Sequence, residues 1–224
     1  MLKCSHQFDF MNLVANKFKL DPEIDVIFRT PLNTKIDESK GRNNRSDSYM
    51  IEEKIKKELL SSDIFIFCSP VYLHNVSGSA KNFLDSLVEW SHTMALSGKL
   101  GVVVSVSSSN GNDFVNSYLS KVLRYMGVTI LSSFEINQKD YHDQEIYNTF
   151  TRKKADNIVS IVKKSYEFGV QVSEKQETIF KTYKSMLNKK GLFTSSEEKE
   201  LKKQNFNKMN SFQELFNSKF KGGI

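Results

Sequence analysis

Cysteine, proline and tryptophan are scarce in this chain, whose 224 residues include 2 Cys, 3 Pro and 1 Trp. The two cysteines, Cys4 and Cys68, stand far apart at unrelated positions. Disulfide frameworks and cysteine-based metal or iron–sulfur sites need several cysteines at defined spacings. The sequence therefore argues against both kinds of site and indicates a protein of a reducing compartment.

Long apolar runs and an even spread of charge are also missing. No stretch reaches the roughly 20 apolar residues that span a bilayer, and no secretory signal pattern is present. The formal net charge is +6, but residues 171–224 hold 11 Lys against 6 Asp or Glu, and this net of +5 leaves only +1 elsewhere. A lysine-rich tail without Arg is typical of a solvated surface rather than a nucleic-acid site. We therefore expect a cytoplasmic protein that binds neither membrane nor nucleic acid.

What the chain does contain is a regular alternation of strand and helix patterns. Short β-branched and aromatic runs predict strands, and apolar residues spaced about 3.6 apart predict helices. The uninterrupted apolar run at 63–68 is expected at the centre of the sheet, buried on both faces. This alternation predicts an α/β fold with a parallel sheet covered by helices on both faces. The predicted strands are 24–28, 63–68, 100–106 and 128–131; the predicted helices are 49–60, 80–88, 114–126, 144–168, 174–187 and 197–216, with a polar loop at 33–48.

Two loops follow neighbouring predicted strands, and ligands of open parallel sheets bind beyond the carboxyl ends of the strands. The first loop reads Ser69-Pro70-Val71-Tyr72-Leu73-His74-Asn75-Val76-Ser77-Gly78. Its apolar and aromatic side chains suit stacking, while its backbone N–H groups and Asn75 suit ring nitrogens and carbonyls. A flavin ring meets both demands.

The same segment resembles the NAD(P)H-dependent FMN reductase and multimeric-flavodoxin families. Their hallmark is Ser-Pro-Val-Tyr, a short variable step, Val-Ser-Gly and a Lys-Asn/Ala-Phe-Ile/Leu-Asp helix. This chain has Ser69-Pro70-Val71-Tyr72, Val76-Ser77-Gly78, Lys81-Asn82-Phe83-Leu84-Asp85 and, after the next strand, Ser107-Ser108-Ser109-Asn110-Gly111. The resemblance covers about residues 24–168. It implies a flavodoxin-like, doubly wound, five-stranded parallel sheet whose first strand is short or truncated, with a C-terminal helical extension.

The resemblance further implies that FMN lies with its ring between the two loops and that NAD(P)H is the co-substrate. Because the flavin carries the chemistry, no catalytic side chain is expected, and the protein supplies stacking and N–H donors. The implied function is an oxidoreductase that passes hydride or electrons from the nicotinamide through FMN to a quinone, flavin, nitro or azo compound, or another small organic acceptor. The predicted cofactor-binding residues are Ser5, Gln7, Asn12, Ser69, Pro70, Val71, Tyr72, Leu73, His74, Asn75, Val76, Ser107, Ser108, Ser109, Asn110 and Gly111.

The amino-terminal segment departs from the family pattern, which places a Gly-Ser-x-Arg-x-x-Ser/Gly-Asn-Thr loop around the FMN phosphate. Here most of strand one is missing, and only Ser5 and Asn12 align loosely with that loop. Either the start of the protein lies upstream of Met1, or the chain is a degenerate relative that binds flavin weakly or not at all. In the second case it would be a flavodoxin-shaped interaction protein without catalytic activity. Residues 33–48 also lack the cysteines of the iron–sulfur members, so neither a cluster nor another metal site is expected.

Several other residues have a plainer interpretation beside the functional one. His74 either lies beside the ring and influences the acceptor or is an incidental loop residue. Tyr72 directly follows a predicted buried strand, which favours ligand contact over core packing. Cys68 is expected to be an inert core residue and His92 a surface or packing residue. A Ser-His-Asp hydrolase would need a Gly-x-Ser-x-Gly elbow, which the sequence lacks.

Beyond Gly169 the strand pattern stops, and two weakly amphipathic helical stretches follow. They keep too many large apolar residues for a purely solvated tail. We expect residues 1–169 to form the flavodoxin-like FMN-binding domain and residues 170–224 a basic helical extension that packs on the domain or on a second subunit. Together with the resemblance, this apolar extension favours a homodimer whose site is completed across the interface.

Overall fold

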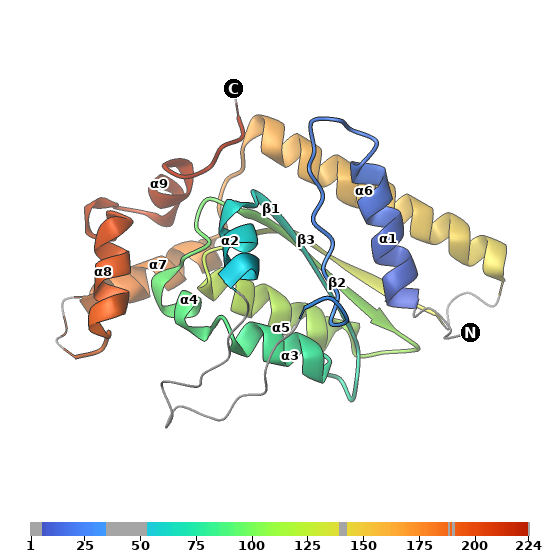
Figure 1. The fold of residues 1–224 in the computed structure, drawn as a ribbon, viewed down its shortest axis with the longest axis horizontal. Coiled ribbons are helices and arrows are strands. Elements are labelled where there is room, and N and C mark those ends of the chain that lie inside the picture. Colours follow the sequence, from blue (N-terminus) through green and yellow to red (C-terminus); the bar gives the residue numbers. More distant parts are fainter. Residues whose placement is uncertain (1–5, 35–52, 139–142, 188, 190, 224) are drawn as a thin grey trace.

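The computed structural model describes residues 6–34, 53–138, 143–187, 189 and 191–223. Within them, three strands form one parallel sheet in the order β1-β2-β3, and helices cover both of its faces (Figure 1). The strands are β1 Ile64–Pro70, β2 Leu100–Ser107 and β3 Thr129–Asn137; the helices are α1 His6–Phe18, α2 Glu53–Ser61, α3 Gly78–Asp85, α4 Val88–Thr93, α5 Asn112–Tyr125, α6 Gln144–Phe168, α7 Glu174–Leu187, α8 Ser195–Lys203, η1 Phe206–Lys208 and α9 Phe212–Asn217. The predicted α/β class and parallel sheet are confirmed; five strands are not. None of the described helices is long and apolar enough to cross a bilayer.

Strand β2 is fully buried and supplies the core on both sides of the sheet. Because successive side chains of a strand point to opposite faces, Val102 and Val104 join one cluster while Val103 joins another. The Val102 side packs against α1 and α6, and the Val103 side packs against α3 and α5. Figure 1 shows these two helical layers on either side of the sheet. Because neither face of β2 is exposed to solvent, β2 is the central strand of the described sheet.

Strand β1 forms where it was predicted. Among the described residues it pairs with β2 alone, from Ile64 opposite Leu100 to Pro70 opposite Val106, and its central position in a larger sheet stays a prediction. Most of its side chains are only half-buried. A run of apolar residues indicates that both faces of a strand can be buried. It does not indicate which strands lie beside it in the sheet.

No strand forms at 24–28, so the predicted strand there is wrong for the described sheet. The alternation itself is present, since Ile24 and Val26 pack on the core while Asp25 and Ile27 are exposed. In the flavodoxin strand order 2-1-3-4-5, the neighbour of this segment is strand one. The residues expected to supply strand one, 1–5, lie outside the described residues, and the segment makes no ladder with β1.

Helix α1 occupies the segment that the family pattern would assign largely to a phosphate loop. Phe10, Val14 and Phe18 recur every four residues and bury one face of the helix against the core shared with α6. The expected loop through Asn12 is therefore helix from His6 onward. The predicted helix at 49–60 is described only from Glu53, and most of the polar loop at 33–48 lies outside the described residues.

The C-terminal extension packs on the amino ends of the strands, at the opposite end of the molecule from the first turn of α1 (Figure 1). Leu100, which begins β2, shares a cluster with Phe180, Phe206 and Phe212, and all four are fully buried. Helix α7 matches its predicted bounds, but the predicted helix at 197–216 is wrong. The segment instead forms α8, η1 and α9. Its buried residues Leu201, Phe206 and Phe212 are five and six positions apart, and residues with this spacing do not lie on one face of a single helix. The division at residue 169 and the homodimer stay predictions.

Candidate functional site

The loop after β1 ends in a tight two-residue turn. The backbone of Tyr72 and Asn75 exchanges hydrogen bonds of 2.9 and 3.0 Å, and the residues between them, Leu73 and His74, have φ of 49° and 59°. Positive φ at both central positions is the geometry of a type I′ turn, which favours Asn-Gly. For a leucine, the left-handed region costs about 1–2 kcal/mol. The turn is held in a conformation that its own residues do not favour.

Buried contacts below the turn anchor this loop to the sheet. The Ser69 hydroxyl accepts a hydrogen bond from the N–H of Ser77 at 3.1 Å and donates to the Pro70 carbonyl at 2.9 Å. The Val71 N–H donates to the carbonyl of Val106 in β2 at 2.9 Å. Ser69 and Val76 are thus buried anchors, whereas the four residues of the turn stand in solvent.

The loop after β2 meets the first loop at Gly111. A Cβ atom at this glycine would lie 2.9 Å from Val71 Cγ1 and 3.0 Å from His74 Nδ1, and its φ of +85° also disfavours other residues. Ser108, Ser109 and Asn110 are exposed on the same loop. The structure therefore brings together the two loops that the sequence placed on either side of the ring.

A buried polar cluster fixes the second loop from beneath. The Asn112 side-chain amide donates to Ser107 Oγ at 2.8 Å and to Asn137 Oδ1 at 2.5 Å, and the Ser107 hydroxyl donates to Asn137 Oδ1 at 2.6 Å. These three residues tie the ends of β2 and β3 to the first turn of α5. The Asn112 Oδ1 atom is buried and has no partner among the described residues. The sequence argument missed Asn112 and Asn137, although both stand where a strand meets a ligand loop.

Hydrogen-bond donors remain available on both loops. The N–H groups of Leu73 and His74 donate to no described acceptor, as expected for the central residues of a type I′ turn. Helix α5 begins after Gly111 without a side-chain cap, so its first N–H groups are open at the end of the helix that carries partial positive charge. A cradle of free donors beside exposed aromatic groups fits the ring of FMN, which the residues 71–75 and 108–112 would hold.

The predicted phosphate residues lie on α1 or outside the described part of the chain. Gln7 is in the first turn of α1 and Asn12 in its second, while Ser5 is not described. The first turns of α1 and α6 meet through the rings of His6 and Tyr147, whose centroids are 5.6 Å apart. Burial, aided by the nearby charge of Asp9, raises the pKa of Tyr147. The role of these residues toward a phosphate stays a prediction.

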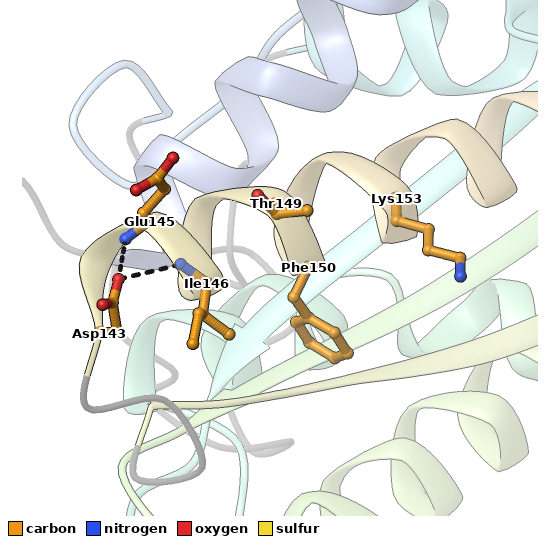
Figure 2. A pocket seen from close by; sticks show the side chains of 6 residues that line it. All are labelled: Asp143, Glu145, Ile146, Thr149, Phe150 and Lys153. Atoms are coloured by element: carbon orange, nitrogen blue, oxygen red, sulfur yellow. Dashed lines mark hydrogen bonds between the residues drawn. The ribbon is translucent and has the colours of Figure 1, made fainter.

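A hollow of about 470 Å³ lies along the start of α6 (Figure 2). Among its lining residues, the Asp143 carboxylate accepts hydrogen bonds from the N–H groups of Glu145 at 2.7 Å and Ile146 at 3.2 Å. The helix end is therefore capped by the chain's own carboxylate, unlike the start of α5. This hollow offers no free N–H pair for an anion, and two of its lining residues are acidic.

The remaining candidates are structural. Cys68 packs on the core, and burial raises the pKa of its thiol, which keeps it protonated and unreactive. His92 contacts Glu197 of α8, with Nδ1 and Oε1 2.6 Å apart, and so joins α4 to the extension. Among the described residues, no three His, Cys, Asp or Glu side chains are grouped to hold a metal ion.

Known structures share this architecture. RosB with its bound intermediate 8-demethyl-8-formylriboflavin-5′-phosphate aligns with 73% of this chain and 75% of its own, at 11% identity and a TM-score of 0.56. A putative quinone reductase from Klebsiella pneumoniae aligns with 70% of this chain and 80% of its own, at 11% identity and a TM-score of 0.52. At such low identity these matches show the fold alone.

Sequence comparison identifies the family. An iron–sulfur flavoprotein of Archaeoglobus fulgidus is 25% identical over 131 residues, 57% of this chain, and an FMN-dependent NADH:quinone oxidoreductase of Psychromonas ingrahamii is 26% identical over 125 residues, 49% of this chain. The chain spans 57% and 56% of the length of these two relatives. The family model described as NADPH-dependent FMN reductase matches residues 11–143, more than half of the chain and including both ring loops. The resemblance carried by the Ser-Pro-Val-Tyr segment is thereby confirmed, and the chain belongs to the NADPH-dependent FMN reductase family.

Proposed function

We propose that this chain holds FMN at the two ring loops and works as an NAD(P)H-dependent oxidoreductase that reduces a quinone, free flavin, nitro or azo compound, or a related small organic acceptor. With a quinone the balanced reaction is NAD(P)H + H⁺ + quinone → NAD(P)⁺ + hydroquinone. When bound, the flavin supplies the hydride and electron chemistry. The chain's own residues supply binding, orientation and donors.

Contact of the two loops at Gly111 is the observation that carries this proposal. It joins the Val71–His74 segment, in which the N–H groups of Leu73 and His74 donate to no described acceptor, to the uncapped start of α5. Donors at both places would favour negative charge on a reduced ring without any proton transfer by a side chain. The buried Ser107–Asn112–Asn137 cluster would keep the second loop in place while the ring exchanges electrons. The described loops contain no acid or base that the reaction requires.

The decisive measurement is FMN binding by the full chain. FMN titration should quench flavin fluorescence and raise the melting temperature, because a ligand of the native state stabilises it by about 2.7 kcal/mol at a hundredfold excess over Kd. The loaded protein should then oxidise NADH or NADPH when a quinone is added. Unchanged melting together with no quenching would contradict the proposal and support the flavodoxin-shaped interaction protein instead.

Two glycines provide a matched pair of variants for the loop contact. Gly111 and Gly191 both have φ of +85°, but a Cβ at Gly111 would strike Val71 and His74 whereas a Cβ at Gly191 would meet no described atom within 4 Å. Both substitutions to alanine impose the same backbone strain. Gly111→Ala should weaken FMN binding by at least tenfold, and Gly191→Ala should leave it unchanged. Equal FMN affinity in the two variants would mean that FMN binding does not depend on the loop contact at Gly111.

A further inference from the structure

We propose that the hollow between helices α3, α4, α5 and α7 is an accessory binding site for a small aromatic carboxylate, with the ring against its tyrosines and the carboxylate on Lys121. The hollow measures about 350 Å³, and side chains of all four helices line it; these helices are labelled in Figure 1. Such a volume is typical of small-molecule sites. Binding there would not depend on the proposed flavin chemistry, because none of residues 71–75 and 108–112 lines the hollow.

Contacts between the domain and the C-terminal extension hold the walls of the hollow. The Tyr183 hydroxyl of α7 donates to the Ser91 carbonyl of α4 at 2.6 Å, and the centroids of the Tyr183 and Tyr125 rings lie 6.1 Å apart, with planes at 61°. The contact of His92 with Glu197 joins α4 to α8 as well. The hollow is therefore formed before a ligand arrives, which lowers the cost of ordering side chains on binding.

Apolar and aromatic side chains make up most of the lining. Leu84 and Met126 are buried members of the core, whereas Val88, the first residue of α4, is 47% exposed. The rings of Tyr118 and Tyr125 are half-buried beside them. Aliphatic groups and tyrosine rings together offer a contact surface for a flat aromatic ring, which would also remove Val88 from water.

Two hydrogen-bond donors of the lining have no partner among the described residues. They are the Tyr118 hydroxyl and the Lys121 amine, which make no hydrogen bond there. The two residues are three positions apart on α5 and so lie on one face of the helix. Burial raises the pKa of Tyr118, which keeps its hydroxyl protonated and able to donate. A ligand that supplies an acceptor to both groups would satisfy them together.

The charges of the lining favour a ligand with one negative charge. Asp85 is the one acid among the lining residues, and it pairs with Lys81 one turn earlier on α3. Lys121 is left without a carboxylate partner in the described part of the chain. One ammonium beside one phenol matches a carboxylate. A phosphate, with a charge of about −1.5 to −2, would find this lysine but no arginine in the lining.

The test measures binding of 2-naphthoate to the full chain saturated with FMN, by isothermal titration calorimetry and by melting temperature. One site per chain with a Kd below about 1 mM is expected, together with a rise in melting temperature, because the ligand binds the native state. The uncharged 2-naphthylmethanol should bind at least about tenfold more weakly, since it keeps the ring and loses the charge. The same Kd for 2-naphthoate is expected without FMN, because the hollow is separate from the ring loops.

Exposed positions of the lining provide variants that leave the core intact. Lys121→Met should weaken 2-naphthoate binding about tenfold, and Lys121→Arg should restore it. Lys153→Met is the matched control, because Lys153 is an exposed lysine that lines the hollow at the start of α6 instead; it should keep the wild-type Kd. Val88→Glu places a negative charge in the lining and should abolish binding without lowering the melting temperature of the free chain.

The site is overturned if 2-naphthoate shows no saturable binding, or if Lys121→Met and Lys153→Met have the same affinity for it. Equal affinity for 2-naphthoate and 2-naphthylmethanol also overturns it, because the charge would then be irrelevant. A change of oligomeric state in Val88→Glu, measured by light scattering, would mean that a second copy of the chain covers the hollow. FMN affinity, measured on the same preparations, decides the proposed oxidoreductase function separately.

Discussion

The two ends of the β-sheet treat their apolar side chains in opposite ways. At the amino end, Phe180, Phe206 and Phe212 are fully buried beneath the C-terminal extension, with Phe180 and Phe206 centroids 4.6 Å apart. At the carboxyl end, Leu73 and Phe114 are more than half exposed. The backbone follows the same division. Gln176 and Gln204 of the extension donate to the carbonyls of Arg124 at 2.9 Å and Thr93 at 3.1 Å, whereas the N–H groups of Leu73 and His74 donate to no acceptor in the described part of the chain.

This contrast supports the proposal that the amino end of the sheet serves folding and the carboxyl end serves binding. Buried polar groups are nearly always paired in native proteins. At the amino end the aromatic rings of the extension are buried and its two glutamines are paired, although Thr129 Oγ1 at the start of β3 is buried with no partner among the described residues. The carboxyl end combines exposed apolar side chains, the buried Asn112 Oδ1 with no described partner and a leucine in the left-handed region, and such concentrated exceptions are typical of functional sites.

The largest effect on stability should come from disrupting the aromatic cluster at the amino end of the sheet. Phe180→Ala removes the central ring of the cluster shared by the extension and β2 and should lower the free energy of unfolding by about 3–5 kcal/mol. FMN affinity of the folded protein should stay unchanged, because the cluster lies at the other end of the sheet. Urea denaturation and FMN titration measure the two quantities. The exposed Phe168→Ala should change stability by less than about 0.5 kcal/mol; a loss of less than about 1 kcal/mol in Phe180→Ala would refute the structural role of the extension.

A smaller effect, but one that reaches the ligand, is expected from the polar cluster at the carboxyl end. Asn112→Leu removes both donors to Ser107 and Asn137 and should cost about 1–3 kcal/mol of stability together with a loss of FMN affinity. Asn116→Leu is the matched control, since Asn116 is equally buried on α5 but donates to the Phe134 carbonyl at 3.2 Å. It should lose similar stability and keep FMN affinity. Equal affinity losses in both variants would deny the cluster a role in positioning the loop.

Sequence reasoning was most accurate where local pattern and local chemistry coincide. The bounds of α6 and α7 match their predicted ranges. Apolar residues at helical spacing define both helices, and Asp143 as N-cap and Gly169 at the end also delimit α6, so these bounds depend only on local sequence. Strand β2 extends its prediction by one residue. The two ring loops were identified because motif and strand ends agreed. All of these features depend on neighbours in the chain.

The parts that sequence reasoning does not decide concern neighbours in space. The predicted strand at 24–28 does not form in the described sheet, and whether 63–68 is central depends on the strands beside it, because periodicity carries no information on pairing. Helix α1 was missed because the family pattern assigned that segment a loop. Phe114 was read as the start of a helix, and only the three-dimensional contact with His74 sets it apart from Val115.

The amino end also predicts a pH dependence of stability. Burial lowers the pKa of Lys219 from 10.5 to about 8, with Glu200 opposing the shift and Lys99 and Lys203 adding to it. Between these two pH values the unfolded chain binds more protons than the folded one, so stability should rise with pH, by on the order of 1–2 kcal/mol after allowance for solvent screening. From pH 7.5 to pH 9.5 the melting temperature of the wild type should rise relative to that of Lys219→Met. Lys221 is an exposed lysine paired with Asp63, so Lys221→Met should keep the wild-type rise. If Lys221→Met loses the rise as Lys219→Met does, the assignment of the effect to Lys219 is contradicted.

The smallest effect sharpens the comparison most, because it should improve one property and damage another. Leu73→Asn places in the turn the residue that its φ of +49° favours, and should raise the free energy of unfolding by about 1 kcal/mol. The same change removes an exposed apolar group from the first ring loop and should weaken FMN binding. Differential scanning calorimetry and FMN titration on one preparation test both halves. A variant that gains stability and keeps its FMN affinity would mean that the leucine is tolerated rather than used; a variant that loses stability would mean that the turn is not strained by its leucine.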